Sequence, residues 1–364
     1  MKTIVHVVGA RPNYMKIAPL MDALTHVPGI RQILVNTGQH YDEAMSKGFL
    51  RELALPVPDR DLEVGSGSHA VQTAKVMIGF EEVCLAERPD LVVVVGDVNS
   101  TLAATLVAAK LLIPVAHVEA GLRSGDRTMP EEINRLVTDR LADLLLTPSQ
   151  DGDAHLKAEG VPAEKIVFVG NIMIDTLMRH LPIATLDRLR PRLDLKERAY
   201  AVLTLHRPSN VDHAATFKGI LEAVHEIARD LPIVFPVHPR TRERVREFGL
   251  ERYFQGVTMT EPLGYVDFLS LTSHARLMLT DSGGLQEEST ALGIPCLTLR
   301  ENTERPVTVT HGTNRVVGVN PANILAGYRA AMAMSQADLD RRPPLWDGHT
   351  AERIAAVLQK YLFG

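Results

Sequence analysis

The chain has 364 residues, of which 45% are hydrophobic and 23% are charged, and its formal net charge is -5. This length predicts about two domains, and the composition is typical of a globular protein. A mildly acidic chain gives no reason to expect nucleic acid or an anionic membrane as a partner. The distant cysteines Cys84 and Cys296 predict free thiols rather than a disulfide framework. No signal peptide or long apolar segment is recognisable, so we expect a cytoplasmic protein.

Apolar strand-like runs alternate with helical patterns along the whole chain. The first series comprises Ile4–Val8, Gln32–Asn36, Leu91–Val95, Val115–Val118, Leu144–Leu146 and Ile166–Val169. The second series comprises Ala201–Leu205, Ile233–Val237, Leu277–Thr280, Pro295–Leu299 and Arg315–Val319. Unbroken apolar strands separated by helices predict parallel sheets that helices cover on both faces. The sequence therefore predicts an α/β protein with two doubly wound, Rossmann-like domains.

The boundary between these domains is predicted after Gly170. A helical pattern over Ile174–His180 leads there into a basic, proline-bearing stretch. We therefore expect an N-terminal domain over residues 1–170 and a C-terminal domain over residues 171–349. The last helical pattern, within residues 350–364, follows the Pro343-Pro344 break. We expect this helix to pack back on the first domain.

Cationic side chains follow the first strand. The turn after Val8 contains a single glycine, then Arg11 and Lys16, so it lacks the G-x-G-x-x-G pattern of dinucleotide-binding folds. Cations at this position suit an anionic ligand, although surface charge beside a turn would also explain them. Asp97 follows the strand Leu91–Val95 in the same way. It could cap the next helix, but Asn99 or Ser100 can supply that cap, which leaves Asp97 for a site.

The richest polar segment runs from His117 to Arg135. His117, Glu119 and Arg123 come at the end of a buried strand, and Pro130 opens a helix. Glu131 and Arg135 are four residues apart, so they share a face of that helix. Two carboxylates, a histidine and two arginines at a strand end indicate a site for an anionic substrate and proton transfer. A capped, salt-bridged helix is the structural alternative.

Two strand ends in the second half carry further polar residues. His206 and Arg207 follow the strand Ala201–Leu205 and could bind phosphate or move a proton, or could simply form a turn. The strand Leu277–Thr280 leads into Asp281, Ser282, Gly283 and Gly284 and then a helix, which is the strongest phosphate signal in the chain. Glu288, one to two turns into this helix, could bind the hydroxyls of a ribose.

Three Asp-x-Asp triplets raise the question of a metal. They begin at Asp59, Asp151 and Asp338. Helix capping explains the second, and the other two fit solvated loops. The histidines show no spacing typical of metal ligands. We expect no metal and no cofactor.

Together these motifs resemble the non-hydrolysing UDP-N-acetylglucosamine 2-epimerases. The matching segments occur in the order of the family and span nearly the whole chain. They are Gly9–Leu20, Gly96–Thr101, His117–Arg135, Gly170-Asn171, His206-Arg207, Pro236–His238, Thr280–Glu288 and Thr303–Pro306. The resemblance implies two Rossmann-like domains with the site in the cleft between them, as in GT-B glycosyltransferases. It also implies a UDP-sugar substrate and a homodimer.

The resemblance implies a role for each matching residue. Asp97, Glu119 and Glu131 would be catalytic carboxylates, and His206 would act near the diphosphate with Arg135 beside it. Ser282, Gly283 and Gly284 would bind the diphosphate and Glu288 the ribose. The backbone around Pro262–Tyr265 would bind the uracil. The remaining residues expected to line the cleft are Arg11, Lys16, His238 and Arg305.

The implied reaction interconverts UDP-GlcNAc and UDP-ManNAc. No carbonyl activates the C2 proton, so UDP would leave C1 as a base removes that proton, and re-addition to the 2-acetamidoglucal would complete the inversion. Three alternatives stay open. The chain could act on a related UDP-sugar such as a diacetamido uronic acid, could be a GT-B glycosyltransferase, or could bind a UDP-sugar without catalysis.

Overall fold

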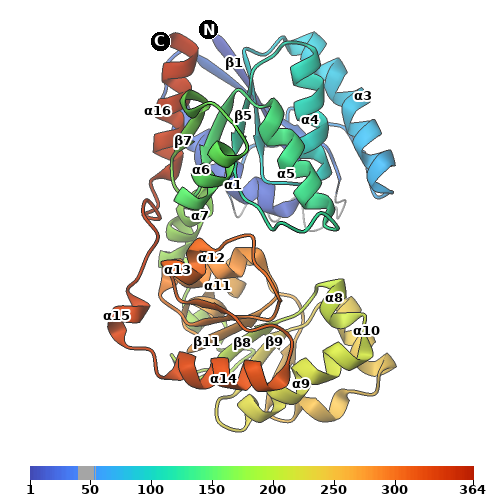
Figure 1. Cartoon of the computed structure of the whole chain (residues 1–364), viewed down its shortest axis with the longest axis vertical. Coiled ribbons are helices and arrows are strands. Elements are labelled where there is room, and N and C mark those ends of the chain that lie inside the picture. Colours follow the sequence, from blue (N-terminus) through green and yellow to red (C-terminus); the bar gives the residue numbers. More distant parts are fainter. Residues whose placement is uncertain (40–52, 54) are drawn as a thin grey trace. The chain divides into compact units, whose positions relative to one another are not determined.

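The computed structural model describes residues 1–39, 53 and 55–364 (Figure 1). The chain forms two compact units. The first unit contains Met1–Thr176 and Pro344–Gly364, and the second contains Leu177–Pro343. Each unit is built on its own parallel sheet.

The first unit contains a seven-stranded sheet in the order β3-β2-β1-β4-β5-β6-β7, and every neighbouring pair of strands is parallel. The strands are β1 (Lys2–Val8), β2 (Ile30–Asn36), β3 (Arg60–Asp61), β4 (Leu91–Val95), β5 (Val115–Val118), β6 (Leu144–Thr147) and β7 (Ile166–Phe168). The strand order reverses between β1 and β4. In doubly wound sheets ligands bind outside the carboxyl ends of the strands at this point.

Alternation along the strands explains why they are apolar throughout. Leu91, Val93 and Val95 belong to one buried cluster, whereas Val92 and Val94 belong to another on the opposite face. Helices contribute apolar side chains to both clusters, so no face of the central strands meets water. The helices that begin in this unit are α1 (Arg11–Thr25), α3 (His69–Glu87), α4 (Asn99–Lys110), α5 (Pro130–Leu141), α6 (Gln150–Ala158), α7 (Ile172–His180) and α16 (Thr350–Phe363), and all of them except α5 contribute to these clusters.

The C-terminal helix α16 packs on the first unit, next to α1 (Figure 1). Its Ile354 and Leu358 are fully buried in the same cluster as β1 and β4. The carboxylate of Asp175 accepts hydrogen bonds from the first backbone N–H groups of the helix, at 3.2 Å from Thr350 and 2.7 Å from Ala351. A side chain from α7 thus caps the helix that ends the chain.

The second unit contains a six-stranded sheet in the order β10-β9-β8-β11-β12-β13, again with parallel neighbours. Its strands are β8 (Ala201–Thr204), β9 (Ile233–Pro236), β10 (Val257–Thr260), β11 (Leu277–Thr280), β12 (Cys296–Thr298) and β13 (Asn314–Val316). Its helices are α8 (Pro208–Val211), α9 (Ala214–Ala228), α10 (Pro239–Glu247), α11 (Tyr265–Ser273), α12 (Gly283–Leu292), α13 (Val307–Thr310), α14 (Pro321–Met332) and α15 (Gln336–Leu339). The order reverses between β8 and β11.

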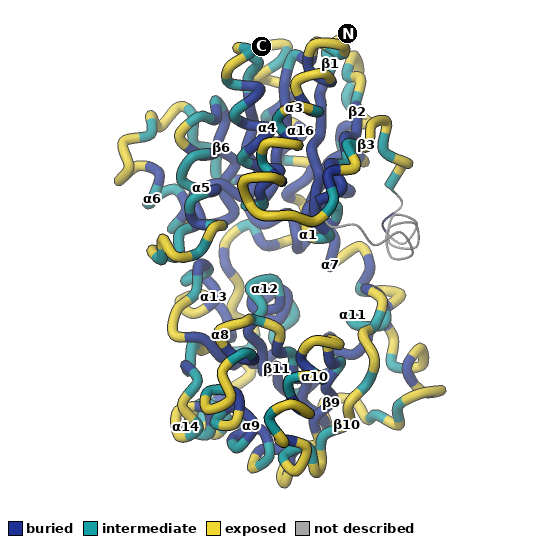
Figure 2. Tube along the Cα trace, turned by 90° about the vertical axis from the view of Figure 1, so that its right-hand side faces the viewer, coloured by how far each residue is buried: buried dark blue, intermediate teal, exposed yellow. Residues whose placement is uncertain are grey.

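The predicted α/β class with two doubly wound parallel sheets is confirmed. Figure 2 shows the buried residues concentrated in the strands of each unit. Both cysteines are free and buried, as predicted. Within the described ranges, no helix combines the length and apolar character needed to cross a bilayer.

Candidate active site

The carboxyl ends of β1 and β4 approach each other closely in the first unit. A Cβ at Gly9 would lie 2.3 Å from Ser100 Oγ and 2.6 Å from Thr37 Oγ1, so only glycine fits between these side chains. The hydroxyls of Thr37 and Ser100 are themselves 2.8 Å apart. This contact holds the end of β2 against the start of α4, next to Gly9 at the end of β1.

Lys16 and Glu119 form a buried ion pair at this edge. Their side chains are 8% and 5% exposed, and the Lys16 ammonium donates to Glu119 Oε2. Glu119 follows β5 with φ of 73°, in the left-handed region that non-glycine residues rarely adopt. Such backbone strain clusters at functional sites, where the surrounding structure holds it in place. Lys16 therefore holds a carboxylate whose backbone is itself constrained.

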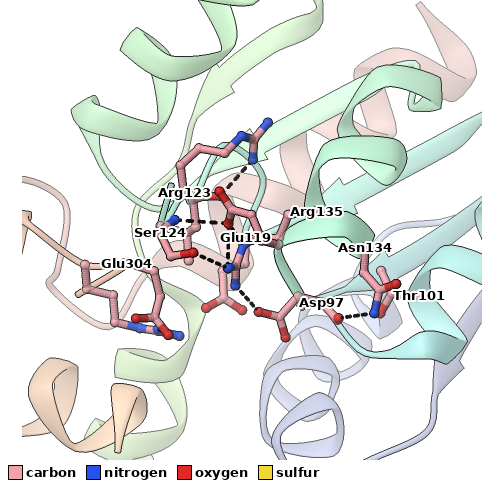
Figure 3. A network of polar contacts seen from close by, with 12 residues as sticks. Asp97, Thr101, Glu119, Arg123, Ser124, Asn134, Arg135 and Glu304 are labelled. Carbon is pink, nitrogen blue, oxygen red and sulfur yellow. Dashed lines mark hydrogen bonds and ion pairs between the residues drawn. The ribbon is translucent and has the colours of Figure 1, made fainter. Parts of the chain in front are cut away.

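Asp97 is paired with Arg135 of α5. Arg135 Nη1 donates to Asp97 Oδ2 at 2.5 Å, and the Arg135 side chain is only 3% exposed (Figure 3). The Asp97 side chain is 31% exposed, so the carboxylate is both charge-paired and open to a ligand. The amide of Asn134 donates to the backbone carbonyl of Asp97 at 2.8 Å and fixes the turn.

Arg135 forms its second ion pair with Glu132, which the sequence analysis did not single out. Arg135 Nη2 is 2.6 Å from Glu132 Oε2, and Glu132 also accepts backbone N–H bonds of 3.0 Å from Ser124 and Gly125. Burial opposes ionisation of Glu132, but these backbone bonds and Arg135 lower the pKa of its carboxyl. Glu131 is half-buried at the start of the same helix. A search for acidic residues three positions from Arg135 on the same helix would have found Glu132.

His117 and Arg123 differ from the expectation that they face the ligand. His117 is fully buried, with Nδ1 at 2.6 Å from Asp139 Oδ1 and Nε2 at 2.8 Å from the carbonyl of Gly96. Arg123 Nη1 bonds Asp139 Oδ2 at 2.7 Å. Although burial opposes ionisation, His117 and Arg123 lower the pKa of Asp139. These residues tie the turn before Asp97 to α5, which is a supporting role.

In the second unit, a histidine and an aspartate meet at the ends of β8 and β11. His206 Nδ1 lies 3.0 Å from Asp281 Oδ1, with side chains 53% and 0% exposed. Asp281 Oδ2 also accepts from the backbone N–H of Arg207 at 3.0 Å. Burial raises the pKa of Asp281, but the interactions with His206 outweigh it and the net shift is downward. An ionised carboxylate only accepts, so Nδ1 of His206 carries the proton of this contact. Asp281 was not predicted as a site residue.

The start of α12 brings backbone N–H groups and an arginine together. Ser282 is the N-cap residue and makes no side-chain capping bond, and Gly283 begins the helix. A Cβ at Gly283 would lie 2.5 Å from Arg305 Nη1, so glycine lets the guanidinium approach the helix start. Arg305 Nε is 2.8 Å from Glu287 Oε1. Helix starts bind anions because their N–H groups and dipole favour negative charge.

Three arginines and two glutamates surround this helix start. The buried Glu304 lies 2.8 Å from Arg300, 3.5 Å from Arg305 and 3.4 Å from Arg207. Burial opposes ionisation of Glu304, yet the three arginines lower its pKa to about 2. Glu287 pairs with Arg305 in the same way, so carboxylates hold the arginines in position around the helix start. Guanidinium groups held in this way suit a phosphate or diphosphate.

The predicted residues thus lie in two groups, one in each unit. In the first unit, contacts join Lys16 to Glu119 and Arg135 to Asp97, and Arg11 and Glu131 lie at the starts of α1 and α5. In the second unit, Arg305 approaches Gly283 at the start of α12, where Ser282 and Gly284 also lie, and Glu288 lies further along this helix. His206 and His238 follow β8 and β9. His238 is exposed and accepts from the backbone N–H of Arg240 at 3.3 Å, so it also caps α10. Among the described side chains, no group of His, Cys, Asp and Glu could hold a metal ion.

Comparison with known proteins identifies this arrangement. The family model described as UDP-N-acetylglucosamine 2-epimerase matches residues 22–359. The UDP-N-acetylglucosamine 2-epimerase of Methanocaldococcus jannaschii is 43% identical over 97% of both chains. The UDP-2,3-diacetamido-2,3-dideoxy-D-glucuronate 2-epimerase of Pseudomonas aeruginosa is 38% identical over 98% of this chain and 99% of that one. A crystal structure of the M. jannaschii UDP-GlcNAc 2-epimerase with UDP-GlcNAc and UDP matches with a TM-score of 0.89, covering 99% of this chain and 100% of that one at 42% identity.

Proposed function

The chain belongs to the UDP-N-acetylglucosamine 2-epimerase family, and we propose that it interconverts UDP-GlcNAc and UDP-ManNAc. The observation that carries the proposal is the pairing of Asp97 and Glu119 with buried cations at one sheet edge. Two carboxylates held in fixed positions are what a proton exchange at two faces of a sugar ring requires. A structural role alone would not require the backbone strain and the buried ion pair of Glu119.

We propose an elimination and re-addition. A carboxylate removes the C2 proton while the C1–O bond breaks, its electron pair leaves with UDP, and a C1–C2 double bond forms. A second group returns a proton to C2 from the opposite face, and UDP re-adds to C1. The net change is inversion at C2 without oxidation.

The residues of the two units have different roles in this reaction. We assign proton transfer to Asp97, Glu119 and Glu131, and stabilisation of the leaving UDP to His206. The start of α12, with the arginines around it, would hold the diphosphate, and Glu288 would bind the ribose. The other substrate-binding residues of the proposal are Arg11, Lys16, Arg135, His238, Ser282, Gly283, Gly284 and Arg305.

An NMR time course of UDP-GlcNAc with the purified protein tests the activity. We expect a mixture with UDP-ManNAc to form without acceptor, NAD or added metal, and EDTA to leave the rate unchanged. In D2O, deuterium should appear at C2 of the product because the intermediate has lost its C2 hydrogen. Turnover without deuterium incorporation would contradict the elimination route, and no turnover at all would favour the glycosyltransferase or the silent binding protein.

A second candidate substrate is a UDP-diacetamido uronic acid. The P. aeruginosa relative named for that sugar is 38% identical, close to the 43% of the M. jannaschii relative named for UDP-GlcNAc. The same assay with both sugars, compared by kcat/KM, decides between them. A higher value for the uronic acid would replace the GlcNAc assignment and leave the C2 chemistry intact.

We further propose that the protein works in the cytoplasm as a homodimer and supplies sugar nucleotides for cell-surface polysaccharides. Its two buried cysteines are free, as is usual in reducing compartments. Exposed apolar side chains on α3 support self-association.

A further inference from the structure

The carboxyl edge of the second sheet carries the groups assigned to UDP, and the opposite, amino edge carries a separate set of arginines. His206 and Ser282 follow the carboxyl ends of β8 and β11, whereas Arg198 and Arg276 precede the first residues of the same two strands. Strands β8 and β11 are parallel neighbours, so they begin at the same edge of the sheet. Both arginines therefore lie at the end of the second unit that is remote from the start of α12.

A cavity of about 230 Å³ lies at this amino edge, and Arg198, Arg276 and Arg342 all line it. In the part of the chain that the structure describes, Asp340 is the one acidic residue that lines the same cavity. The Asp340 carboxylate accepts a 2.9 Å hydrogen bond from the side chain of Gln336. Three guanidinium groups against one carboxylate leave a net positive charge at the cavity.

The three arginines of the cavity differ from those around the start of α12 in their partners. Arg305 and Arg207 lie within 3.5 Å of buried carboxylates. By contrast, no carboxylate of the described residues is within ion-pair distance of Arg198, Arg276 or Arg342. Guanidinium groups that gather at a cavity without carboxylate partners can donate to an anionic ligand.

Backbone carbonyls hold two of these arginines in place. Arg198 Nη1 donates to the carbonyl of Ala275 at 2.7 Å, and Arg342 Nε donates to the carbonyl of Ala291 at 2.8 Å, in the last turn of α12. Each side chain keeps further N–H groups, because a guanidinium has five donors. Positions that are fixed before a ligand arrives lower the entropy cost of binding it. The bond from Arg342 also offsets the partial negative charge at the end of α12.

Gly293 allows Arg342 to approach the end of α12. This glycine is the C-cap residue of the helix with φ of 69°, and a Cβ there would lie 2.7 Å from Arg342 Nη2. Burial lowers the pKa of the Arg342 guanidinium, and the nearby charge of Asp340 opposes this shift only in part. A bound anion would favour the charged guanidinium, so the environment of Arg342 suits such a ligand.

We propose that this cavity binds a phosphate group, separately from the UDP site at the other edge of the sheet. Three arginines can surround the oxygens of one phosphate with charge-assisted hydrogen bonds. The volume of about 230 Å³ lies below the roughly 300 Å³ at which pockets for drug-sized ligands begin, so the cavity suits inorganic phosphate or a small phosphate monoester rather than a nucleotide sugar. The site lies within the second unit, so the inference does not depend on the epimerase activity.

Titration calorimetry of the full chain with inorganic phosphate tests the site. Saturating UDP is present throughout, so that the anion site at the start of α12 is filled. We expect one phosphate to bind per chain. Arg276→Gln and Arg198→Gln should each raise the Kd by about tenfold or more, because each removes a charge-assisted contact. Arg246→Gln is the matched control, since Arg246 is an exposed arginine of α10 that does not line the cavity.

Two further variants keep the test decisive. Arg276→Lys retains the charge but loses the planar fork of donors, so its Kd should lie between those of the wild type and Arg276→Gln, and it decides the outcome if circular dichroism shows Arg276→Gln to be unfolded. Arg305→Ala should leave the Kd for phosphate unchanged, which separates this site from the one at the start of α12 even if UDP does not bind. A wild type that binds no phosphate, or binding that the changes at Arg276 do not weaken, overturns the proposal.

The same titration with glycerol 3-phosphate and with acetate identifies the ligand class. Tighter binding of glycerol 3-phosphate than of inorganic phosphate would indicate a phosphorylated metabolite, and the reverse order would indicate the free ion. Both orders support a phosphate site. Acetate has a single charge and two oxygens, so it should bind at least about tenfold more weakly than phosphate. Acetate that binds as tightly as phosphate would contradict the assignment to phosphate.

Discussion

At the scale of single residues, the candidate site is defined by how its charges are held. Two carboxylates at the edge of the first sheet have buried cationic partners, Lys16 for Glu119 and Arg135 for Asp97. A buried charge without a partner would be costly, so these pairs hold the carboxylates in place. The proton transfers proposed for these carboxylates require such fixed positions.

Glu119→Gln and Glu131→Gln test the assignment of the proton transfers. Both changes nearly preserve shape but remove the titratable group, so each should lower kcat by at least about a hundredfold. Binding of UDP should persist, because the anion site lies at the start of α12 in the second unit. Titration calorimetry with UDP and the epimerisation assay measure the two effects.

A control and a stability measurement complete this test. Glu352→Gln, an exposed change on α16, should leave kcat unchanged. Glu119→Gln also removes the charge beside Lys16, so thermal unfolding must show that the variant is folded at the assay temperature. Near wild-type rates in both active-site variants would move the proton chemistry to Asp97 and His206.

Glu304 makes part of the stability of the second unit depend on pH. Its pKa lies near 2, compared with 4.5 for an ordinary glutamate, since Arg305, Arg300 and Arg207 favour the ionised form. A lowered folded-state pKa contributes stability above the unfolded value that is lost as pH falls through the folded value. The shift corresponds to about 3 kcal/mol, present above about pH 4.5 and lost towards pH 2.

Glu304→Gln should therefore destabilise the second unit at pH 7 by about 3 kcal/mol, and the difference from the wild type should shrink between about pH 4.5 and pH 2. Urea unfolding followed by circular dichroism across this range measures the difference. Glu301→Gln, an exposed glutamate three residues earlier, is the control. A difference that stays constant from pH 7 to pH 2 would show that Glu304 is not ionised by its arginines.

The sequence predicts residue types at strand ends better than the partners of each residue. Asp97, Glu119 and Ser282 were predictable because a polar residue directly after an apolar strand must lie at the carboxyl edge. Asp139 and Asp281 were not assigned to the site, because each holds a side chain that is distant in sequence and no local spacing encodes that contact. Glu132 was also missed, although its i,i+3 spacing from Arg135 does encode its ion pair. His117 and Arg123 were predicted to face the ligand, but both contact Asp139 instead and hold the turn before Asp97.

At the scale of elements, unbroken apolar runs made the inner strands predictable, whereas β3 and β10 were missed. Both missed strands lie at the end of a sheet. Arg60 and Asp61 of β3 are exposed, and β10 has its two central residues exposed, so neither carries the buried pattern that identifies inner strands. Their place is set by pairing with β2 and β9 rather than by their own side chains.

The C-terminal helix offers a prediction at this scale. Ile354 of α16 is fully buried in the core of the first unit, so Ile354→Ala should destabilise that unit by about 2 to 5 kcal/mol. Trp346 is the single tryptophan of the chain, is 5% exposed and donates to the carbonyl of Pro148 at 2.9 Å. Its fluorescence therefore reports on the first unit alone.

In Ile354→Ala, the unfolding midpoint measured by this fluorescence should shift to a lower denaturant concentration. The unfolding midpoint of the second unit should not change. Glu352→Ala, on the exposed side of the same helix, should change the midpoint very little. An unchanged midpoint in Ile354→Ala would mean that α16 adds little to the core on which it packs.

At the scale of the whole molecule, the proposed reaction needs groups from both compact units. The carboxylates Asp97 and Glu119 belong to the first unit, and His206 and the start of α12 belong to the second. The chain crosses between the units near Thr176 and again near Pro343. A ligand that binds groups from both units favours the arrangement in which those groups come together.

UDP should therefore make the molecule more compact. Small-angle scattering at saturating UDP should give a smaller radius of gyration than the ligand-free protein, with the dimer mass unchanged. Arg305→Ala removes a cation at the start of α12 and should raise the concentration of UDP needed for the change by about tenfold or more, since a charge-assisted contact to phosphate is lost. Uridine lacks the diphosphate and so cannot contact the arginines around α12. It should therefore reduce the radius of gyration less than UDP does. A scattering profile that UDP does not alter would mean that both units already hold their catalytic positions before the substrate arrives.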